Sequence, residues 1–182
     1  MTDRTPFAKI GDQELWNGDA LELLNALPSL AADAVITDPP YCSGGTSIAE
    51  KAMDPRVKYC RSGKDLGRPT FAGDARDQRS FAIWCTLWLT AARRHVRPGG
   101  YCLVFCDWRQ LPAMTDVFQA GGFVWRGLIA WNKGRGSRAP HKGYFRHQCE
   151  YVIWGTNGPC PKATHGGPWD GCQQFPVLQS DK

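Results

Sequence analysis

Four consecutive residues, Asp38, Pro39, Pro40 and Tyr41, have the clearest chemical potential in this sequence, and they directly follow an apolar run, Ala34–Thr37. The two prolines fix the backbone and remove two N–H donors, which leaves carbonyl oxygens free to accept hydrogen bonds. An aspartate oxygen and a proline carbonyl can together accept from a planar NH2 group. Such a pair would hold the nitrogen and draw out its lone pair to attack a methyl group, while Tyr41 offers a face for stacking a planar ring.

The elements before this motif predict a parallel α/β sheet. Leucines recur at helical spacing from Leu21 to Leu27, and Pro28 ends the run. Ala34–Thr37 is then predicted to be a short buried strand. A helix followed so closely by a strand is typical of α/β folds, which place ligands at the carboxyl ends of their strands. The motif at residues 38–41 would stand at that position.

The elements after the motif continue the α/β pattern. We expect helices at Phe81–Val96 and Pro112–Ala120, and strands at Tyr101–Phe105, Phe123–Trp131 and Tyr151–Trp154. The first helix shows an apolar stripe and should end at Arg97–Gly100; the stripe comprises Ile83, Trp84, Leu87, Trp88 and Ala91. We predict that residues 1–158 form one unit and that 42–80 are a long irregular insert in it, which is mobile. Residues 159–182 would be an irregular tail.

Composition favours a folded intracellular protein of about one domain. Of 182 residues, 42% are hydrophobic and 12% aromatic. No apolar run approaches the roughly 18 residues that span a bilayer, and the first ten residues lack a signal-peptide core, so we expect a cytoplasmic protein without membrane contact. The eight cysteines should be reduced thiols. A zinc site at Cys160, His165 and Cys172 is the alternative, but its spacing is irregular, so we expect no metal.

The net charge of +5 is unevenly distributed. Residues 1–41 hold seven acidic and two basic residues, whereas 42–182 hold ten acidic and twenty basic ones. Between Asp116 and Glu150 there is no acidic residue, but there are six basic ones. This segment suits a polyanion such as nucleic acid, although a merely solvated basic face explains the charge equally well.

Several stretches in one order resemble a known family. They are Asn17–Glu22, Leu27–Pro28, Asp33–Tyr41, Val96–Gly100, Trp131–Gly136 and Phe145–Gly155. Over about residues 13–158 they resemble DNA amino-methyltransferases of the β arrangement, in which the catalytic motif precedes the cofactor-binding motif. The resemblance implies a partial Rossmann-like sheet with helices on both faces. It also implies S-adenosylmethionine as cofactor and duplex DNA as partner. Residues 1–158 would then be the catalytic half, with the mobile 42–80 insert facing DNA and the target base, and residues 159–182 would begin a target-recognition or linker region.

The same resemblance implies roles for matching residues. Asp38, Pro39, Pro40 and Tyr41 would bind the base amine, and Asp19, Ala20 and Asp38 would contact the cofactor. For Asp19, a helix N-cap is an equally good interpretation. The DNA phosphates would be contacted by Lys133, Arg135, Arg138, Lys142 and Arg146. The individual basic residues of the 42–80 insert are better explained as solvated surface residues.

Two elements of that family do not occur in this sequence. They are the Phe-x-Gly-x-Gly-like turn that holds the methionine part of the cofactor, and the His-Pro-Thr-x-Lys-Pro-like segment before it. We therefore expect these residues to be a fragment of a longer polypeptide. Its sheet would expose an apolar edge, so the chain should associate with itself or a partner, or bind cofactor poorly.

The motif leaves several activities open. Asp38 favours adenine N6, because cytosine-N4 enzymes more often resemble Ser-Pro-Pro, while protein-amide enzymes resemble Asn-Pro-Pro-Tyr. Methylation of RNA stays open on the motif alone. A non-catalytic remnant that binds nucleic acid would keep the basic segment but lack methyl transfer. We predict adenine-N6 methylation of duplex DNA with base flipping, in a restriction–modification system, a phage or as a solitary enzyme.

Overall fold

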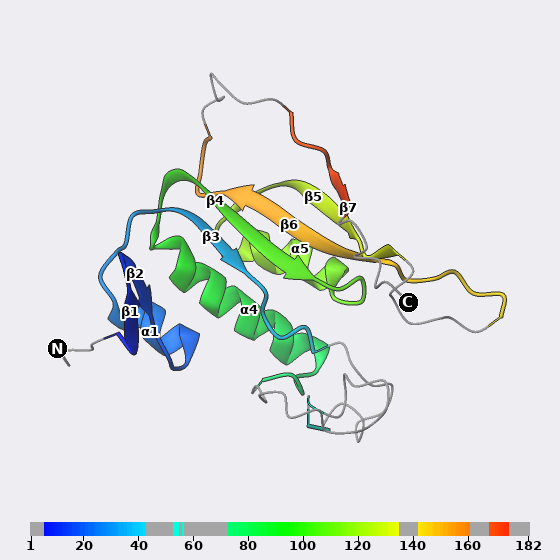
Figure 1. Ribbon diagram of the computed structural model, residues 1–182, viewed down its shortest axis with the longest axis horizontal. Coiled ribbons are helices and arrows are strands. Elements are labelled where there is room, and N and C mark those ends of the chain that lie inside the picture. Colours follow the sequence, from blue (N-terminus) through cyan, green and yellow to red (C-terminus); the bar gives the residue numbers. More distant parts are fainter. Residues whose placement is uncertain are drawn as a thin grey trace.

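The computed structural model describes residues 6–42, 53–54, 56, 73–134, 142–160 and 168–174, which form two separate sheets and three helices (Figure 1). A hairpin joins β1 (Ala8–Ile10) to β2 (Gln13–Leu15). The main sheet has the order β3-β4-β6-β5-β7. Its strands are β3 (Ala32–Thr37), β4 (Val96–Cys106), β5 (Val124–Asn132), β6 (Cys149–Thr156) and β7 (Cys172–Gln174). The helices are α1 (Ala20–Ala26), α4 (Gln78–Arg93) and α5 (Leu111–Ala120).

Within the main sheet, one strand runs against the others. β3 is parallel to β4, and β5 is parallel to β7, whereas β6 lies between β4 and β5 and is antiparallel to both. The carboxyl ends of β3, β4 and β5 therefore meet the start of β6 at a single edge. We name this edge, which includes Thr37, Cys106, Asn132 and Cys149, the catalytic edge.

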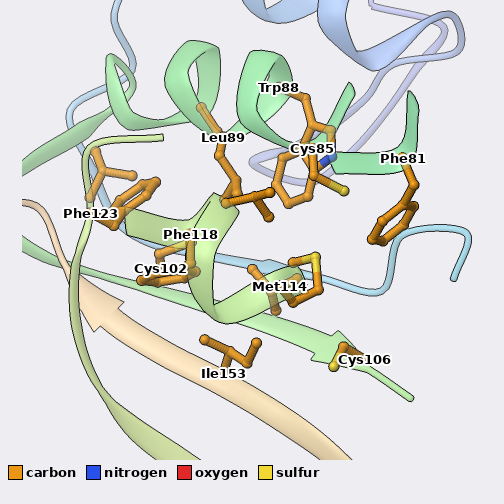
Figure 2. Packing of buried hydrophobic residues seen from close by; sticks show 14 of the residues in the cluster. Phe81, Cys85, Trp88, Leu89, Cys102, Cys106, Met114, Phe118, Phe123 and Ile153 are labelled. Atoms are coloured by element: carbon orange, nitrogen blue, oxygen red, sulfur yellow. The ribbon is translucent and has the colours of Figure 1, made fainter. Parts of the chain in front are cut away.

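The hydrophobic core lies on one face of this sheet. α4 and α5 pack against each other and against β4 and β6, as Figure 2 shows. The residues that meet there include Cys85 and Leu89 of α4, Met114 and Phe118 of α5, Cys102 and Cys106 of β4, and Ile153 of β6. At Gly155 of β6, an added Cβ would lie 2.5 Å from the Phe118 ring and would overlap the backbone, so this close approach requires glycine. α1 joins the same layer through α4.

The prediction of an α/β sheet is confirmed, but its second layer is not seen. All three described helices belong to the layer on one face. The alternation along β4 explains why: Cys102, Val104 and Cys106 point into the core, while Tyr101 and Leu103 point to the opposite face and stay partly exposed. Helices on both faces were expected; among the described residues the face of Tyr101 carries none.

The exposure of β3 also differs from the prediction of a buried strand. Among the described residues it lies at the edge of the sheet and pairs with β4 alone, and Ile36 is 68% exposed. Of the described residues of β3, only Val35, in the middle of the strand, packs against the core. The expected exposed apolar edge is therefore present.

Two further predictions about α4 and β4 were wrong in detail. Ile83 and Leu87 point outward from α4, and Phe81, Cys85 and Leu89 are buried in their place. The Arg97–Gly100 stretch does not end the helix but lies inside β4, where pairing moves from Val96 to Tyr101 while β3 advances only from Ala32 to Ala34. Within the described residues, no helix is long and apolar enough to cross a bilayer.

Candidate active site

The motif of residues 38–41 leaves β3 at the catalytic edge, immediately after Thr37, which pairs with Val104 of β4. Asp38 is exposed to solvent, whereas Pro39, Pro40 and Tyr41 are half-buried. The Tyr41 hydroxyl hydrogen-bonds to the Asp38 carboxylate; burial, followed by this bond and the charge of Asp38, raises the pKa of Tyr41. Tyr41 therefore stays neutral and donates to Asp38, whose remaining oxygen lone pairs are free to accept from an incoming amine.

A buried clamp fixes the residue that follows the motif. The Cys42 amide donates to Oδ1 of Asp74 at 2.9 Å, and the Cys42 thiol donates to the Gly73 carbonyl, with Sγ···O 3.1 Å. Asp74 is only 5% exposed, and Cys42 has a φ of +54°, in the left-handed region that a non-glycine residue rarely adopts. Strained backbone of this kind persists where surrounding contacts hold it. The clamp thus sets the direction in which residues 38–41 leave the sheet.

An ion pair stands beside the motif at the start of β6. Glu150 pairs with Trp131 of β5 in the sheet, and Lys133 Nζ lies 2.5 Å from Glu150 Oε1 and 5.0 Å from the Trp131 ring centroid. The charge of Glu150 also contributes to the raised pKa of Tyr41, which places the two side chains in one electrostatic environment. Lys133 was predicted to contact DNA phosphate, but in this structure it is engaged by Glu150.

An aromatic pair forms the other side of the catalytic edge. Trp108, which follows β4, stacks on His147, which precedes β6, with centroids 4.4 Å apart and planes 10° from parallel. The Arg109 guanidinium lies 5.0 Å from the Trp108 centroid and is paired with Asp107. Stacked rings beside a cation are suited to binding planar, negatively charged ligands such as nucleotides.

The predicted cofactor residues Asp19 and Ala20 stand at the start of α1. Asp19 caps this helix by accepting from the Glu22 amide at 3.0 Å, and Ala20 is the first residue of the helix. The N-cap interpretation of Asp19 is confirmed, and its contact with a cofactor stays a prediction.

The remaining predicted DNA contacts are divided between described and undescribed parts of the chain. Lys142 is exposed and Arg146 is half-buried, both on the segment that leads into β6 at the catalytic edge. Arg135, Arg138 and most of the 42–80 insert lie outside the described residues, as does His165 of the alternative zinc site. The seven described cysteines are free thiols.

Sequence reasoning missed Asp74, Trp108, His147 and Glu150. Asp74 reaches the end of the motif through its hydrogen bond with Cys42, and Glu150 lies near Tyr41 because β6 pairs within the sheet, while Trp108 and His147 meet each other at the same end of the sheet. The resemblance had matched the stretch containing His147 and Glu150 without giving either a role. Trp108 and Asp74 carried no periodic or motif pattern of their own.

An exposed carboxylate and two prolines stand at a strand end of an α/β sheet, and an aromatic pair stands at the same end of that sheet. The chain belongs to the DNA methylase family, whose N6/N4 model matches residues 32–165. The type II methyltransferase M.ScaI of Streptomyces caespitosus is 24% identical over 155 residues, covering 85% of this chain and 44% of its own length. The chain spans about half the length of the curated relatives that it matches.

Solved structures confirm the fold. The PvuII DNA methyltransferase, titled cytosine-N4-specific, superposes with a TM-score of 0.57 at 17% identity, covering 93% of this chain and 59% of that one. The M1.HpyAVI complex with S-adenosylmethionine gives a TM-score of 0.52 at 18% identity, covering 88% and 66%. The predicted Rossmann-like methyltransferase sheet is therefore confirmed.

Proposed function

We propose that this chain carries the base-handling half of a DNA methyltransferase that methylates adenine N6 in duplex DNA after base flipping. The observation that carries the proposal is the exposed Asp38 carboxylate at the end of β3, hydrogen-bonded by a neutral Tyr41. Family membership supports the reaction class. The restriction–modification setting is supported only by the names of type II relatives.

The chemistry at Asp38 follows from its hydrogen-bonding capacity. Asp38 and the Pro39 carbonyl would accept the two N–H bonds of an extruded adenine, leaving the nitrogen lone pair directed away from the ring. Positive charge develops on this nitrogen as the new N–C bond forms, and the fixed negative oxygens stabilise it. The released proton would pass to Asp38 or to water at its exposed side. Tyr41, Trp108 and His147 supply ring faces against which a base can stack.

S-adenosylmethionine is the proposed methyl donor, and the described residues fit it only in part. Asp38 places a negative charge where a sulfonium would react, but Asp19 is used by its own helix. The sulfonium would supply an electrophilic methyl group. We propose that the methionine-binding part of the site corresponds to the half of the relatives outside the match. Calorimetric titration with S-adenosylmethionine should therefore show weak binding, and tight binding by residues 1–182 alone would contradict this division.

Methyl transfer tests the central proposal. The chain is incubated with millimolar tritiated S-adenosylmethionine and unmethylated DNA, and the labelled base is identified after digestion. We expect label on N6-methyladenine, with turnover reduced by about 10²- to 10³-fold in Asp38→Ala, the size of effect typical of one lost charge-stabilising group. Asp12→Ala, at an exposed carboxylate in the turn between β1 and β2, is the control. Label on cytosine would show that the reaction is N4 methylation of cytosine and not N6 methylation of adenine. Equal turnover of Asp38→Ala and wild type would refute the role of Asp38.

A non-catalytic remnant is the second candidate, favoured by the half-length match. It predicts DNA binding that weakens steeply with salt and no methyl transfer under any condition. The methyl-transfer assay separates the two candidate functions, because both predict DNA binding but only the first predicts labelled DNA.

A further inference from the structure

A short segment that precedes β6 exposes two adjacent aromatic side chains, Tyr144 and Phe145. It runs from Lys142 to Gln148, and we name it the aromatic arm. Phe145 is 94% exposed, the highest value among the large apolar side chains that the structure describes, and Tyr144 beside it is also strongly exposed. An exposed ring of this kind gains apolar contact if a partner covers it, and its neighbours in sequence indicate which partner could do so.

The base of this arm is held at the catalytic edge. His147 stacks on Trp108, and the Lys133 amide donates to the Gln148 carbonyl at 2.8 Å. Gly143 has a φ of +83° and open space around it, which turns the chain near the start of the arm. In Figure 1 the arm, in yellow, projects from the start of β6, beyond the edge of the sheet at which β4 ends. The ring of Phe145 is thus presented two residues from a side chain packed at the site.

Charge identifies the occupant. Lys142 and Arg146 lie on either side of Phe145 in sequence, and no acidic residue occurs between Asp116 and Glu150. A ring flanked by cations matches a partner whose interior is stacked and apolar and whose outside is anionic. Duplex DNA has this arrangement, with bases inside and phosphates outside.

We propose that Phe145 enters the base stack of duplex DNA at the place vacated by the extruded nucleotide, while Lys142 and Arg146 contact the flanking phosphates. The inference rests on the proposed function, because the vacancy arises only when a base leaves the stack. Extrusion removes two stacking contacts, and an inserted phenyl ring replaces them. Stacking of one base on an aromatic side chain corresponds to about 5- to 150-fold in Kd.

A binding experiment can isolate this ring. The full chain is titrated into two short duplexes, one intact and one with a single abasic site flanked by 2-aminopurine, whose fluorescence reports local stacking. We expect wild type to prefer the abasic duplex, since no base has to be unpaired there, and to change the 2-aminopurine signal. Phe145→Ala should weaken binding to the abasic duplex about fivefold or more and abolish the fluorescence change. Phe145→Trp should retain both.

Salt dependence separates the ring from the cations. Phe145→Ala should leave the slope of log K against log salt unchanged, because no phosphate contact is lost. Lys142→Gln should weaken binding to both duplexes and reduce that slope by about one. Phe7→Ala is the matched control: Phe7 is 75% exposed but lies beside the β1–β2 hairpin, at the N-terminal end of the described chain. Thermal melts of all variants should coincide, since these side chains are solvent-exposed.

The outcomes distinguish this inference from the proposed function. If wild type binds neither duplex, the proposed function fails and the inference fails with it. If wild type binds but Phe145→Ala behaves like Phe7→Ala, the arm does not enter the stack, while DNA methylation stands. Binding to vesicles of anionic phospholipid is the third measurement. Binding to them that depends on Phe145, without any preference for the abasic duplex, would show a membrane surface as the partner and overturn the inference.

Discussion

The two faces of the main sheet are built from the same strands, but the described helices cover only one of them. On one face, Cys102 and Ile153 lie beneath α4 and α5 and are inaccessible to solvent. On the other, Tyr101 and Trp154 stack with centroids 6.5 Å apart, and no described helix covers them. Alternating apolar residues on both faces predict a second layer as clearly as the first. Among the described residues only the first of these layers is present, and we call the other face the open face.

The largest expected difference between the faces lies in stability. Phe118 is fully buried and packs on Phe123 with centroids 5.4 Å apart, so Phe118→Ala should cost about 3–5 kcal/mol of unfolding free energy. Leu103→Ala, at a half-buried position on the open face, should cost about 1–2 kcal/mol, because less surface returns to water. Urea unfolding followed by circular dichroism measures both. Equal costs would mean that the open face is covered in the isolated chain.

Alkaline pH should destabilise the covered face. Burial raises the pKa of the Cys102 thiol to about 12, so the folded chain holds a proton that the unfolded chain loses above its ordinary pKa of 9.0. The thiol's stabilising contribution is complete below pH 9.0 and is lost as the pH rises toward about 12. The slope is at most about 1.4 kcal/mol per pH unit per thiol.

Unfolding at several values within this alkaline window checks the prediction. Cys102→Ala should show a shallower fall of stability with pH than wild type, whatever its absolute stability. Cys172→Ala, at an exposed thiol on β7, should keep the wild-type slope. An unchanged slope in Cys102→Ala would exclude thiol ionisation as the cause.

The smallest effect on folding, but a specific one, concerns association. Ile36 is 68% exposed on the edge strand, and Ile83 is 64% exposed on the outer side of α4. A lysine at either position should change stability by no more than about 0.5 kcal/mol. Only Ile36→Lys should lower self-association in sedimentation velocity, because charge on an edge strand opposes strand pairing. Monomeric wild type, or an equal effect of Ile83→Lys, would argue against association through β3.

Local patterns predicted the elements well where hydrophobic periodicity was strong. α5, β5 and β6 fall within a few residues of their expected positions, since their apolar runs are bounded by glycine turns or polar segments. The inward face of α4 was predicted in part: Trp84, Trp88 and Ala91 face the core as expected, but Ile83 and Leu87 do not. The error arose because Cys85 is a core residue, whereas the stripe was counted on larger side chains. β7 was missed because three residues, Cys172–Gln174, have no periodicity of their own and form a strand only by pairing with β5.

Only the part of the site that is contiguous in the sequence, residues 38–41, was predictable. Residues 38–41 lie at a strand end as expected, because a strand boundary is a local property. Glu150 reaches the site through pairing with Trp131, and His147 through stacking on Trp108, contacts that depend on the sheet order. That order places β6 between β4 and β5, an arrangement that no local pattern encodes.

The clamp between Cys42 and Asp74 has a consequence for how this protein can vary. Two residues that are 32 positions apart in the sequence are held at nearly one point, since the Cys42 amide nitrogen and the Asp74 carboxylate oxygen are 2.9 Å apart. Closing a chain between fixed ends costs little extra as it lengthens, about 0.6 kcal/mol for each doubling. We therefore expect a change of chain length between these two anchors to cost little stability. A reporter domain inserted between these anchors should leave the sheet intact, which makes this position a practical insertion site for engineering.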